Sequence, residues 1–114
     1  MLLVVDDEPV PCTVTARMLR AAGFLVRTAA SGDEALRIVE SEGVRLVVTD
    51  IAMPGMNGLE LAERLRQSRS YLPVLFMSGA MSPREIRAFS GPFLQKPFSE
   101  ADLLREVSRL LPGD

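Results

Sequence analysis

The residues best suited to chemistry in this chain are charged side chains that follow short apolar runs. Asp6 and Asp7 follow the first run, Asp50 follows a later one, and Lys96 comes one glutamine after the last. Lys96 is also the only lysine among the 13 Lys and Arg residues. If the runs are parallel strands, their C-terminal ends share one edge of a sheet, where open α/β folds bind ligands. Three carboxylates would then meet one ammonium, an arrangement that can hold a divalent cation and a phosphoryl group.

Each of these residues also has a purely structural interpretation. Asp6 and Asp7 suit the start of a helix, where the helix dipole favours negative charge. Asp50 suits a turn, because proline and glycine follow it closely. Ser78, which comes after a further apolar run, suits a cap or a turn, and Lys96 suits a solvated surface. Taken singly, these interpretations compete with the chemical one, whereas the combined pattern favours chemistry.

Five short apolar runs alternate with segments of helical period along the chain. The runs are rich in Val, Leu and Phe without alternation, as expected of strands buried on both faces. We expect strands at residues 2–5, 24–28, 46–49, 74–77 and 93–94. Alternating strands and helices with right-handed crossovers predict an α/β fold, a three-layer α/β/α sandwich around a parallel sheet.

The first helical segment carries apolar residues at helical spacing. Val10, Val14, Met18 and Ala21 recur every three or four positions, which predicts a helix with these residues on its apolar face. Gly23 follows directly and predicts the end of this helix.

Capping residues and one apolar stripe indicate later helices. Ser31 and Glu34, three positions apart, predict a capping box. A stripe of Leu and Val over residues 103–111 predicts the last helix, with Ser99 as a weaker cap and Pro112-Gly113 as its end.

The order of the strands follows from the chemistry rather than from periodicity. Asp6 and Asp7 can share a metal ion with Asp50 only if the first and third strands are neighbours. This requirement places the second strand outside the first and predicts the flavodoxin-like order 2-1-3-4-5. The site would then lie at the point where the strand order reverses.

Composition excludes several classes of function. The 114 residues, with 47% hydrophobic and 25% charged side chains, predict one globular domain at residues 1–114. A net charge of −2 argues against nucleic-acid binding, and no apolar run approaches the about 20 residues of a membrane span. The single Cys12 excludes an internal disulfide, so we expect a cytoplasmic domain without membrane contact. The absence of histidine removes His-based catalysis and His metal ligation.

Several motifs occur in one order along the whole chain. They are Asp6-Asp7-Glu8, Asp50 followed by Met53-Pro54-Gly55-Met56-Asn57-Gly58, Ser78-Gly79, and Phe93-Leu94-Gln95-Lys96-Pro97-Phe98. Together they resemble the receiver domain of two-component response regulators. The resemblance implies that Asp50 accepts a phosphoryl group from the phosphohistidine of a histidine kinase or phosphotransfer protein, with Mg²⁺ as cofactor. It implies a signalling domain that catalyses only its own phosphorylation and autodephosphorylation.

The resemblance also implies a role for each site residue. Asp7, Asp50 and the backbone carbonyl of Ala52 would bind the metal directly, and Asp6 would bind it through water. Lys96 would pair with Asp50 before phosphorylation and contact the phosphoryl oxygens afterwards. Carboxylates are hard ligands that suit Mg²⁺, and a carboxylate can act as a nucleophile on phosphorus.

Two further residues form the switch that the resemblance implies. Ser78 would donate its hydroxyl to a phosphoryl oxygen and move inward, and the ring of Phe93 would occupy the space that Ser78 leaves. A cis bond at Lys96-Pro97 is implied as well. The signal would leave through the fourth helix, the fifth strand and the fifth helix, a face that can also form a homodimer.

The segment between Ser78 and Lys96 is short for this family. Only Ile86 and Phe89 offer an apolar face to the fourth helix, which is therefore the weakest prediction. The short segment most resembles the receivers of hybrid histidine kinases. Phe93 stands where tyrosine is frequent, so its ring lacks a hydroxyl group.

Two other functions stay open at the level of sequence. A pseudo-receiver would keep the fold as a protein-interaction module without phosphorylation. A phosphatase or hydrolase on a similar fold is a lesser alternative, because no general base other than the carboxylates is evident. The acidic pair, the acceptor, the hydroxyl and the lysine favour the phosphoacceptor.

Overall fold

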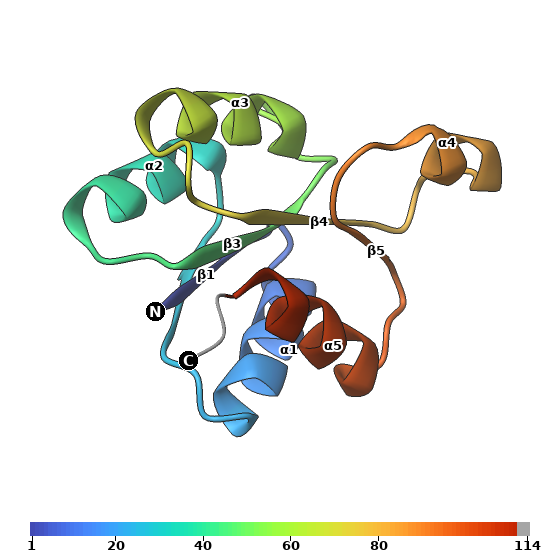
Figure 1. Cartoon of the computed structure of the whole chain (residues 1–114), viewed down its shortest axis with the longest axis horizontal. Coiled ribbons are helices and arrows are strands. Elements are labelled where there is room, and N and C mark those ends of the chain that lie inside the picture. Colours follow the sequence, from blue (N-terminus) through green and yellow to red (C-terminus); the bar gives the residue numbers. More distant parts are fainter. Residues whose placement is uncertain (112–114) are drawn as a thin grey trace.

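A five-stranded parallel sheet with helices on both faces forms the centre of the fold (Figure 1). The computed structural model describes residues 1–111. In chain order the elements are β1 (Leu2–Val5), α1 (Pro9–Ala21), β2 (Val26–Ala29), α2 (Gly32–Ser41), β3 (Leu46–Asp50), α3 (Gly58–Ser68), β4 (Val74–Ser78), α4 (Pro83–Ala88), β5 (Phe93–Gln95) and α5 (Glu100–Leu110). The order β2-β1-β3-β4-β5 confirms the predicted flavodoxin-like sandwich. No helix within residues 1–111 is long and apolar enough to cross a membrane.

Alternate residues of the central strands face opposite layers of helices. Leu2 and Val4 of β1 pack in the core beneath α1 and α5, whereas Leu3 and Val5 pack beneath α2 and α3. All four side chains are buried, which explains why β1 is an unbroken apolar run in the sequence. Packing on both faces fixes the C-terminal end of β1, which Asp6 follows.

The second strand begins two residues later than predicted. The sequence suggested residues 24–28, and the strand is Val26–Ala29. The reason lies at the end of α1, where Gly23 has φ +98° and the Phe24 amide donates to the Leu19 carbonyl at 3.2 Å. Phe24 therefore belongs to a Schellman-type helix end, and the strand starts only after it.

The predicted first helix and its end at Gly23 are confirmed, but the predicted apolar residues do not form its buried face. Val10 and Val14 are 72% and 45% exposed, Ala21 is exposed, and Met18 is only partly buried. The buried face is a different set: Cys12, Thr15, Ala16 and Leu19. Both sets recur at helical spacing, so periodicity alone does not choose between them. The short Cys, Thr and Ala side chains let the helix lie close to the sheet.

Side-chain caps begin four of the helices. Complete capping boxes start α3, α4 and α5, with these N-cap residues: Asn57, Ser82 and Ser99. At α2 the predicted box is only half formed, because Ser31 accepts from the Glu34 amide while the Glu34 carboxylate accepts from the Ala30 amide. The predicted helix end at Pro112-Gly113 lies outside the described residues.

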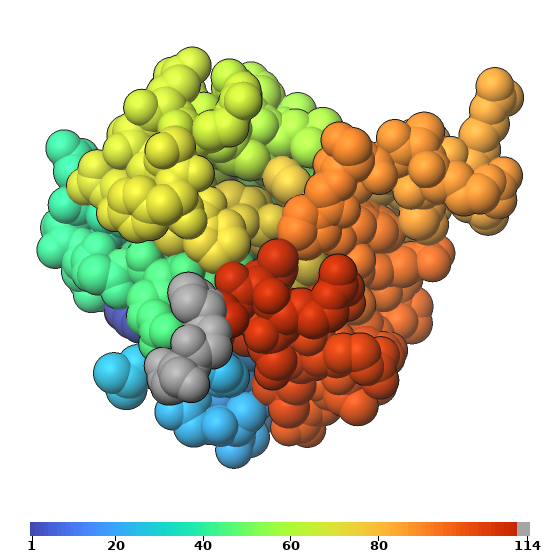
Figure 2. Space-filling model, in the orientation of Figure 1, coloured from blue at the N-terminus to red at the C-terminus, as the bar shows by residue number. Residues whose placement is uncertain are grey.

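Helix α4 projects from the body of the molecule (Figure 2). None of its residues Pro83–Ala88 is buried, in keeping with the sparse apolar pattern of this segment. The following residue, Phe89, connects it to the sheet. The Phe89 ring centroid lies 5.3 Å from that of Phe76 on β4 and 5.4 Å from that of Phe93 on β5.

Candidate functional site

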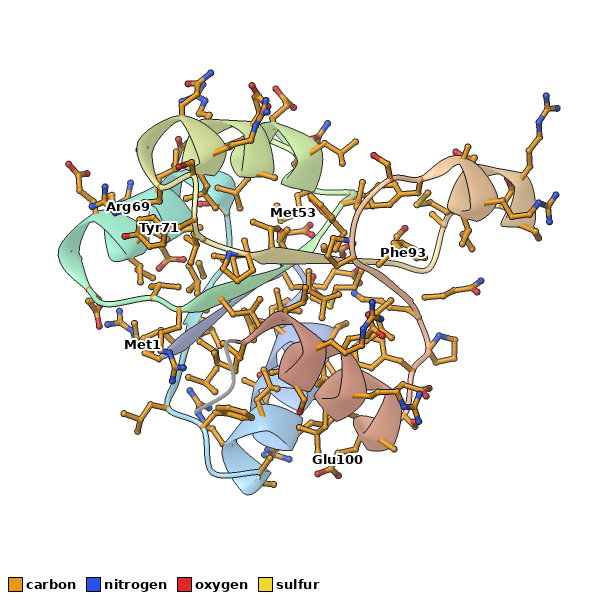
Figure 3. All side chains as sticks on the ribbon, in the orientation of Figure 1. Met1, Met53, Arg69, Tyr71, Phe93 and Glu100 are labelled. Carbon is orange, nitrogen blue, oxygen red and sulfur yellow. The ribbon has the colours of Figure 1, made fainter. Side chains whose placement is uncertain are left out.

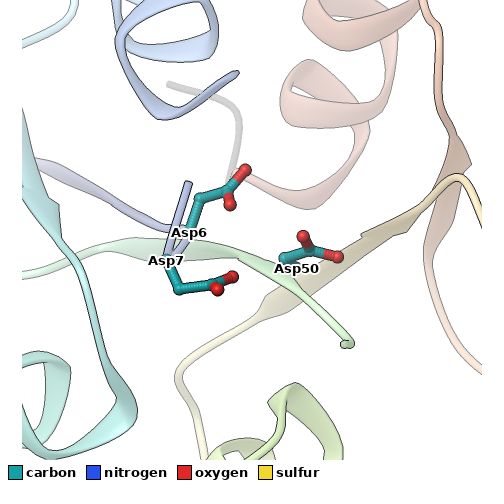
Figure 4. A group of neighbouring side chains, drawn as sticks. All are labelled: Asp6, Asp7 and Asp50. Atoms are coloured by element: carbon teal, nitrogen blue, oxygen red, sulfur yellow. The ribbon is translucent and has the colours of Figure 1, made fainter. Parts of the chain in front are cut away.

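Three carboxylates meet where β1 and β3 end. Asp6 and Asp7 follow β1, and Asp50 is the last residue of the neighbouring β3 (Figure 4). One carboxylate oxygen from each residue lies within 4.8 Å of the others. The proximity follows from the parallel register, in which Val5 stands opposite Thr49 and so brings the next residues of both strands side by side.

Asp6 is held from two sides. Its side chain is fully buried, and its Oδ1 accepts a hydrogen bond from the Glu8 amide at 3.0 Å. Its Oδ2 accepts a hydrogen bond from Lys96 Nζ, also at 3.0 Å. Asp6 therefore makes a turn bond before α1 and also belongs to the charged cluster. The alternative interpretation as a helix cap is wrong, because the N-cap of α1 is Glu8, which makes no side-chain cap bond.

Lys96 brings the single ammonium group to the carboxylates. Its Nζ lies 3.0 Å from Asp6 Oδ2 and 3.3 Å from Asp50 Oδ2, so it bridges the two residues. The family resemblance implied pairing with Asp50, and the shorter contact with Asp6 is additional. The Lys96-Pro97 bond is cis, and the Lys96 amide donates to the Ser78 carbonyl at 3.0 Å, which fixes the backbone at the end of β5.

Burial and charge shift the protonation equilibria of this pair. Burial raises the pKa of the Asp50 carboxyl group above its usual 3.8, and the charge of Lys96 offsets only part of that increase. For Lys96, burial alone would lower the pKa, but the hydrogen bond to Asp6 and the charge of Asp50 leave it above its usual value. The ammonium therefore stays protonated, while Asp50 ionises less readily than an exposed carboxyl group.

Ser78 ends β4 beside the cluster. It is 2% exposed, and it lies one residue beyond Met77, the register partner of Asp50. Its Oγ accepts a hydrogen bond from the Ala80 amide at 3.1 Å, the turn contact that the structural interpretation suggested. The hydroxyl proton is not used in that bond and can be donated elsewhere.

The other two predicted residues lie at the margins of the cluster. Ala52 is exposed in the loop after Asp50, and a hydrogen bond from its backbone lowers the Asp50 pKa in part. Its carbonyl as a metal ligand stays a prediction. Phe93, labelled in Figure 3, is partly buried on β5 and stands opposite Phe76. Its ring contacts Phe89 rather than the carboxylates.

The donor set fits a hard divalent cation. Asp6, Asp7 and Asp50 carry three negative charges when ionised, and Lys96 supplies one positive charge. Two of the three carboxylates are buried, so the remaining negative charge is poorly solvated and favours a bound cation. Oxygen ligands without nitrogen or sulfur suit Mg²⁺ better than zinc or copper.

Sequence reasoning missed an apolar groove that adjoins this cluster. The groove has a volume of about 440 Å³ and runs between α1 and the chain after β5. These residues line it: Pro11, Val14, Thr15, Met18, Gly79, Lys96, Pro97 and Phe98. The apolar stripe of α1 was the signal that could have revealed it, but that stripe is equally typical of a buried face.

Comparisons with known proteins agree on one family. The family model described as response regulator receiver domain matches residues 2–108. The two-component response regulator ORR3 of rice is 35% identical over 96% of this chain and 89% of that protein. The transcriptional regulatory protein TcrA of Mycobacterium tuberculosis is 37% identical over 97% of this chain, which spans only 47% of TcrA.

Solved structures show the same fold. The chemotaxis protein CheY4 of Vibrio cholerae superposes with a TM-score of 0.86 at 31% identity, covering 96% of this chain and 97% of that one. The receiver domain of the hybrid histidine kinase CckA superposes with a TM-score of 0.82 at 35% identity, covering 97% and 98%. The chain is thus similar both to proteins of nearly its own length and to a receiver domain of a hybrid histidine kinase.

Proposed function

Because this chain belongs to the response regulator receiver domain family, the phosphoacceptor domains of two-component systems, we propose that Asp50 accepts one phosphoryl group in a Mg²⁺-dependent reaction. The observation that carries this proposal is the Lys96 ammonium, which bridges Asp6 and Asp50 beside Asp7. Receiver domains are signalling domains rather than classical enzymes. The pseudo-receiver alternative is not favoured, since acceptor, acidic pair, hydroxyl and lysine are all present.

Asp50 acts as the nucleophile of the transfer. An ionised Oδ attacks phosphorus, the new oxygen–phosphorus bond forms an acyl phosphate, and the phosphorus–nitrogen bond of the donor phosphohistidine breaks. The electron pair of that bond goes to the imidazole nitrogen. Phosphoryl transfer depends on position and charge neutralisation more than on acid–base groups, which suits a site without histidine.

The remaining polar groups bind and orient the phosphoryl group. Lys96 neutralises its negative charge, and Ser78 donates its hydroxyl to a phosphoryl oxygen. Asp7, Asp50 and the Ala52 carbonyl would hold Mg²⁺ directly, with Asp6 bound through water. When bound, the ion supplies further neutralisation of the phosphoryl charge. The same site would also carry out the domain's own dephosphorylation.

A protein donor suits this site better than a small molecule alone. Receiver domains interact with histidine kinases or phosphotransfer proteins. In this chain the groove beside Lys96, together with the exposed Val10 and Val14 of α1, offers apolar area for such a protein close to the acceptor. We propose that residues 1–114 act as one domain in the cytoplasm and bind no nucleic acid.

The phosphorylated state reaches partners through the face formed by α4, β5 and α5. When Ser78 is drawn toward the phosphoryl group, Phe93 takes the space beside β4, which shifts the α4–β5–α5 face. This face is our proposed surface for output partners or a homodimer. Support comes from Phe93, which is only partly buried. Among the aromatic pairs of residues 1–111, its one contact is with the ring of Phe89, the residue that follows α4.

Labelling with acetyl phosphate and Mg²⁺ tests the proposal. Wild type should gain one phosphoryl mass that hydroxylamine removes, and Asp50→Asn should gain none. The control Asp33→Asn, an exposed carboxylate at the start of α2, should be labelled like wild type. Stoichiometric labelling of Asp50→Asn would disprove the assignment of the acceptor.

The proposed switch is tested separately, by the backbone amide shifts that phosphorylation causes. Ser78→Ala should still be labelled at Asp50, because the nucleophile and Lys96 are intact. On phosphorylation of wild type, backbone amide shifts should extend from Asp50 to residues 80–104. In Ser78→Ala they should stay near Asp50. Shifts confined to Asp50 in wild type would contradict the proposed switch.

A further inference from the structure

The backbone that carries the acceptor lies against the first residue of α3 without room for a side chain there. A Cβ at Gly58 would stand 2.2 Å from the Asp50 carbonyl oxygen and 2.9 Å from Ile51 Cα. The Gly58 amide also donates to the Ile51 carbonyl at 2.9 Å. The chain therefore leaves β3, makes a loop over residues 51–57, and returns so closely that only glycine fits.

A second glycine, Gly32, contacts the loop of residues 51–57 near its end. A Cβ at Gly32, the first residue of α2, would stand 2.6 Å from Met56 Sδ and 3.1 Å from Met56 Cβ. Between the two contacts, Met53 is 8% exposed and packs in the core beneath α2 and α3. The loop is thus held at its start, middle and end.

We propose that Gly58 and Gly32 are positioning residues that set the direction of the Asp50 carboxylate and of the Ala52 carbonyl. This inference rests on the proposed function, because it concerns the same acceptor. An ordinary contact begins at 3.4 Å and a Cβ at position 58 would stand at 2.2 Å, so an alanine there would force the Asp50 carbonyl oxygen and the new Cβ apart by a further 1.2 Å. That movement rotates the peptide that follows Asp50 and therefore also its side chain.

The two glycines differ in what a side chain would displace. At Gly58 the obstacle is backbone, which moves only if Asp50 moves. At Gly32 the obstacle is mainly the end of the flexible Met56 side chain, which can rotate away in part. Displacements of about 1 Å cost up to about 100-fold in positioned reactions, so Gly58 should matter far more than Gly32.

The test compares three alanine variants. Gly58→Ala should weaken Mg²⁺ binding in calorimetric titration by about 10-fold or more and slow acetyl phosphate labelling at saturating Mg²⁺ by about 10- to 100-fold. Gly32→Ala should weaken binding by about threefold for the smaller displacement. Gly43→Ala is the control, because a Cβ at this exposed glycine meets nothing within 4 Å, and it should match wild type.

Metal-free amide spectra separate positioning from general damage. In Gly58→Ala the amide signals of residues 50–52 and Lys96 should shift, while those of α5 stay in place. A folded Gly58→Ala with wild-type Mg²⁺ affinity and labelling would overturn the proposal. If circular dichroism shows that Gly58→Ala does not fold, the test rests on Gly32→Ala. Unchanged Mg²⁺ affinity of Gly32→Ala, together with unchanged amide signals at residues 50–52, would then overturn the proposal.

The metal-free spectra also distinguish failure of this inference from failure of the proposed function. If wild type is not labelled at Asp50, the proposed function fails. Movement of the Asp50 and Lys96 signals in Gly58→Ala would still support the positioning role. If wild type is labelled and Gly58→Ala behaves like wild type, only the positioning inference fails.

Discussion

The two halves of the C-terminal sheet edge are built very differently. At β1 and β3, every strand residue is buried and two layers of helices hold the ends that carry Asp6 and Asp50. At the other half, β5 has three residues, and none of the residues Pro83–Ala88 in α4 is buried. Chemistry that depends on distances of about 3 Å needs the first kind of packing. A surface that changes with the state of the site needs the second kind, where few contacts must be broken.

The aromatic contacts show that few side chains join α4 to the sheet in the half that contains β5. Phe89 is the link between α4 and the sheet, with its ring at 74° to Phe76 and at 48° to Phe93. The Phe76–Phe89 pair has the edge geometry that aromatic rings favour, whereas the Phe89–Phe93 pair is tilted. Within residues 1–111, the half that contains β1 and β3, here called the acceptor half, depends instead on buried aliphatic side chains and on charged groups. Substitutions in the two halves should therefore differ in kind as well as in size.

The largest effect should come from Lys96→Met in metal-free buffer. The substitution leaves Asp6 and Asp50 without their shared ammonium, and breaking a buried pair costs several kcal/mol. Because Lys96 is 21% exposed, we expect a loss of about 2 kcal/mol in the free energy of unfolding, measured by urea denaturation. Arg105→Met, which breaks the exposed pair with Asp102, is the control and should change stability little. Equal losses in the two variants would contradict a special role for the buried cluster.

Mg²⁺ should stabilise the folded domain by binding at the cluster of Asp6, Asp7 and Asp50. At ten times the dissociation constant, a bound ion adds about 1.4 kcal/mol to the free energy of unfolding, or about 5 °C in melting temperature. Asp7→Asn should abolish this gain and, because like charges are relieved, melt higher than wild type without metal. Asp33→Asn should keep the gain. A wild-type melting temperature that ignores millimolar Mg²⁺ would argue against a metal site.

Phe89→Ala should affect the other half and spare the chemistry. Loss of two aromatic contacts should lower stability by about 1 kcal/mol, and amide exchange should quicken in Pro83–Ala88. The Mg²⁺ response and the labelling of Asp50 should stay as in wild type. The control is Leu25→Ala, whose side chain is 78% exposed. A lost Mg²⁺ response in Phe89→Ala would show that the two halves are not independent.

The smallest effect should be a pH dependence that originates at Asp50. Its pKa is raised in the folded chain, so between 3.8 and the folded pKa the folded state binds more protons than the unfolded state. The stability of wild type relative to Asp50→Asn should therefore rise as pH falls through the folded pKa toward 3.8. Melting temperatures of both proteins in chelator, from neutral pH to pH about 4, measure this difference. A difference that is constant with pH would contradict the raised pKa.

Much of this arrangement was predictable because the chemistry restricts the topology. A site shared by Asp6 and Asp50 requires their strands to be neighbours, and this requirement is enough to predict the strand order. The buried face of α1 was not predictable from periodicity, because two stripes share one period and Val10 lies on the exposed one. The start of β2 was mispredicted because Phe24 completes a helix end, a bond pattern that apolar runs do not reveal. The contact between Gly58 and Asp50 depends on backbone proximity, which residue spacing does not encode.

The bond between Lys96 and Asp6 joins residues 90 positions apart. Ribosomes deliver the chain from its N-terminus, so the three aspartates emerge long before the lysine that balances them. A nascent chain that ends in α3 has the proposed acceptor, Asp50, but not its counter-charge, Lys96. Long-range parallel pairing also forms late in folding. If Asp50 is the acceptor as proposed, the ability to carry a phosphoryl group should arise only when β5 is in place.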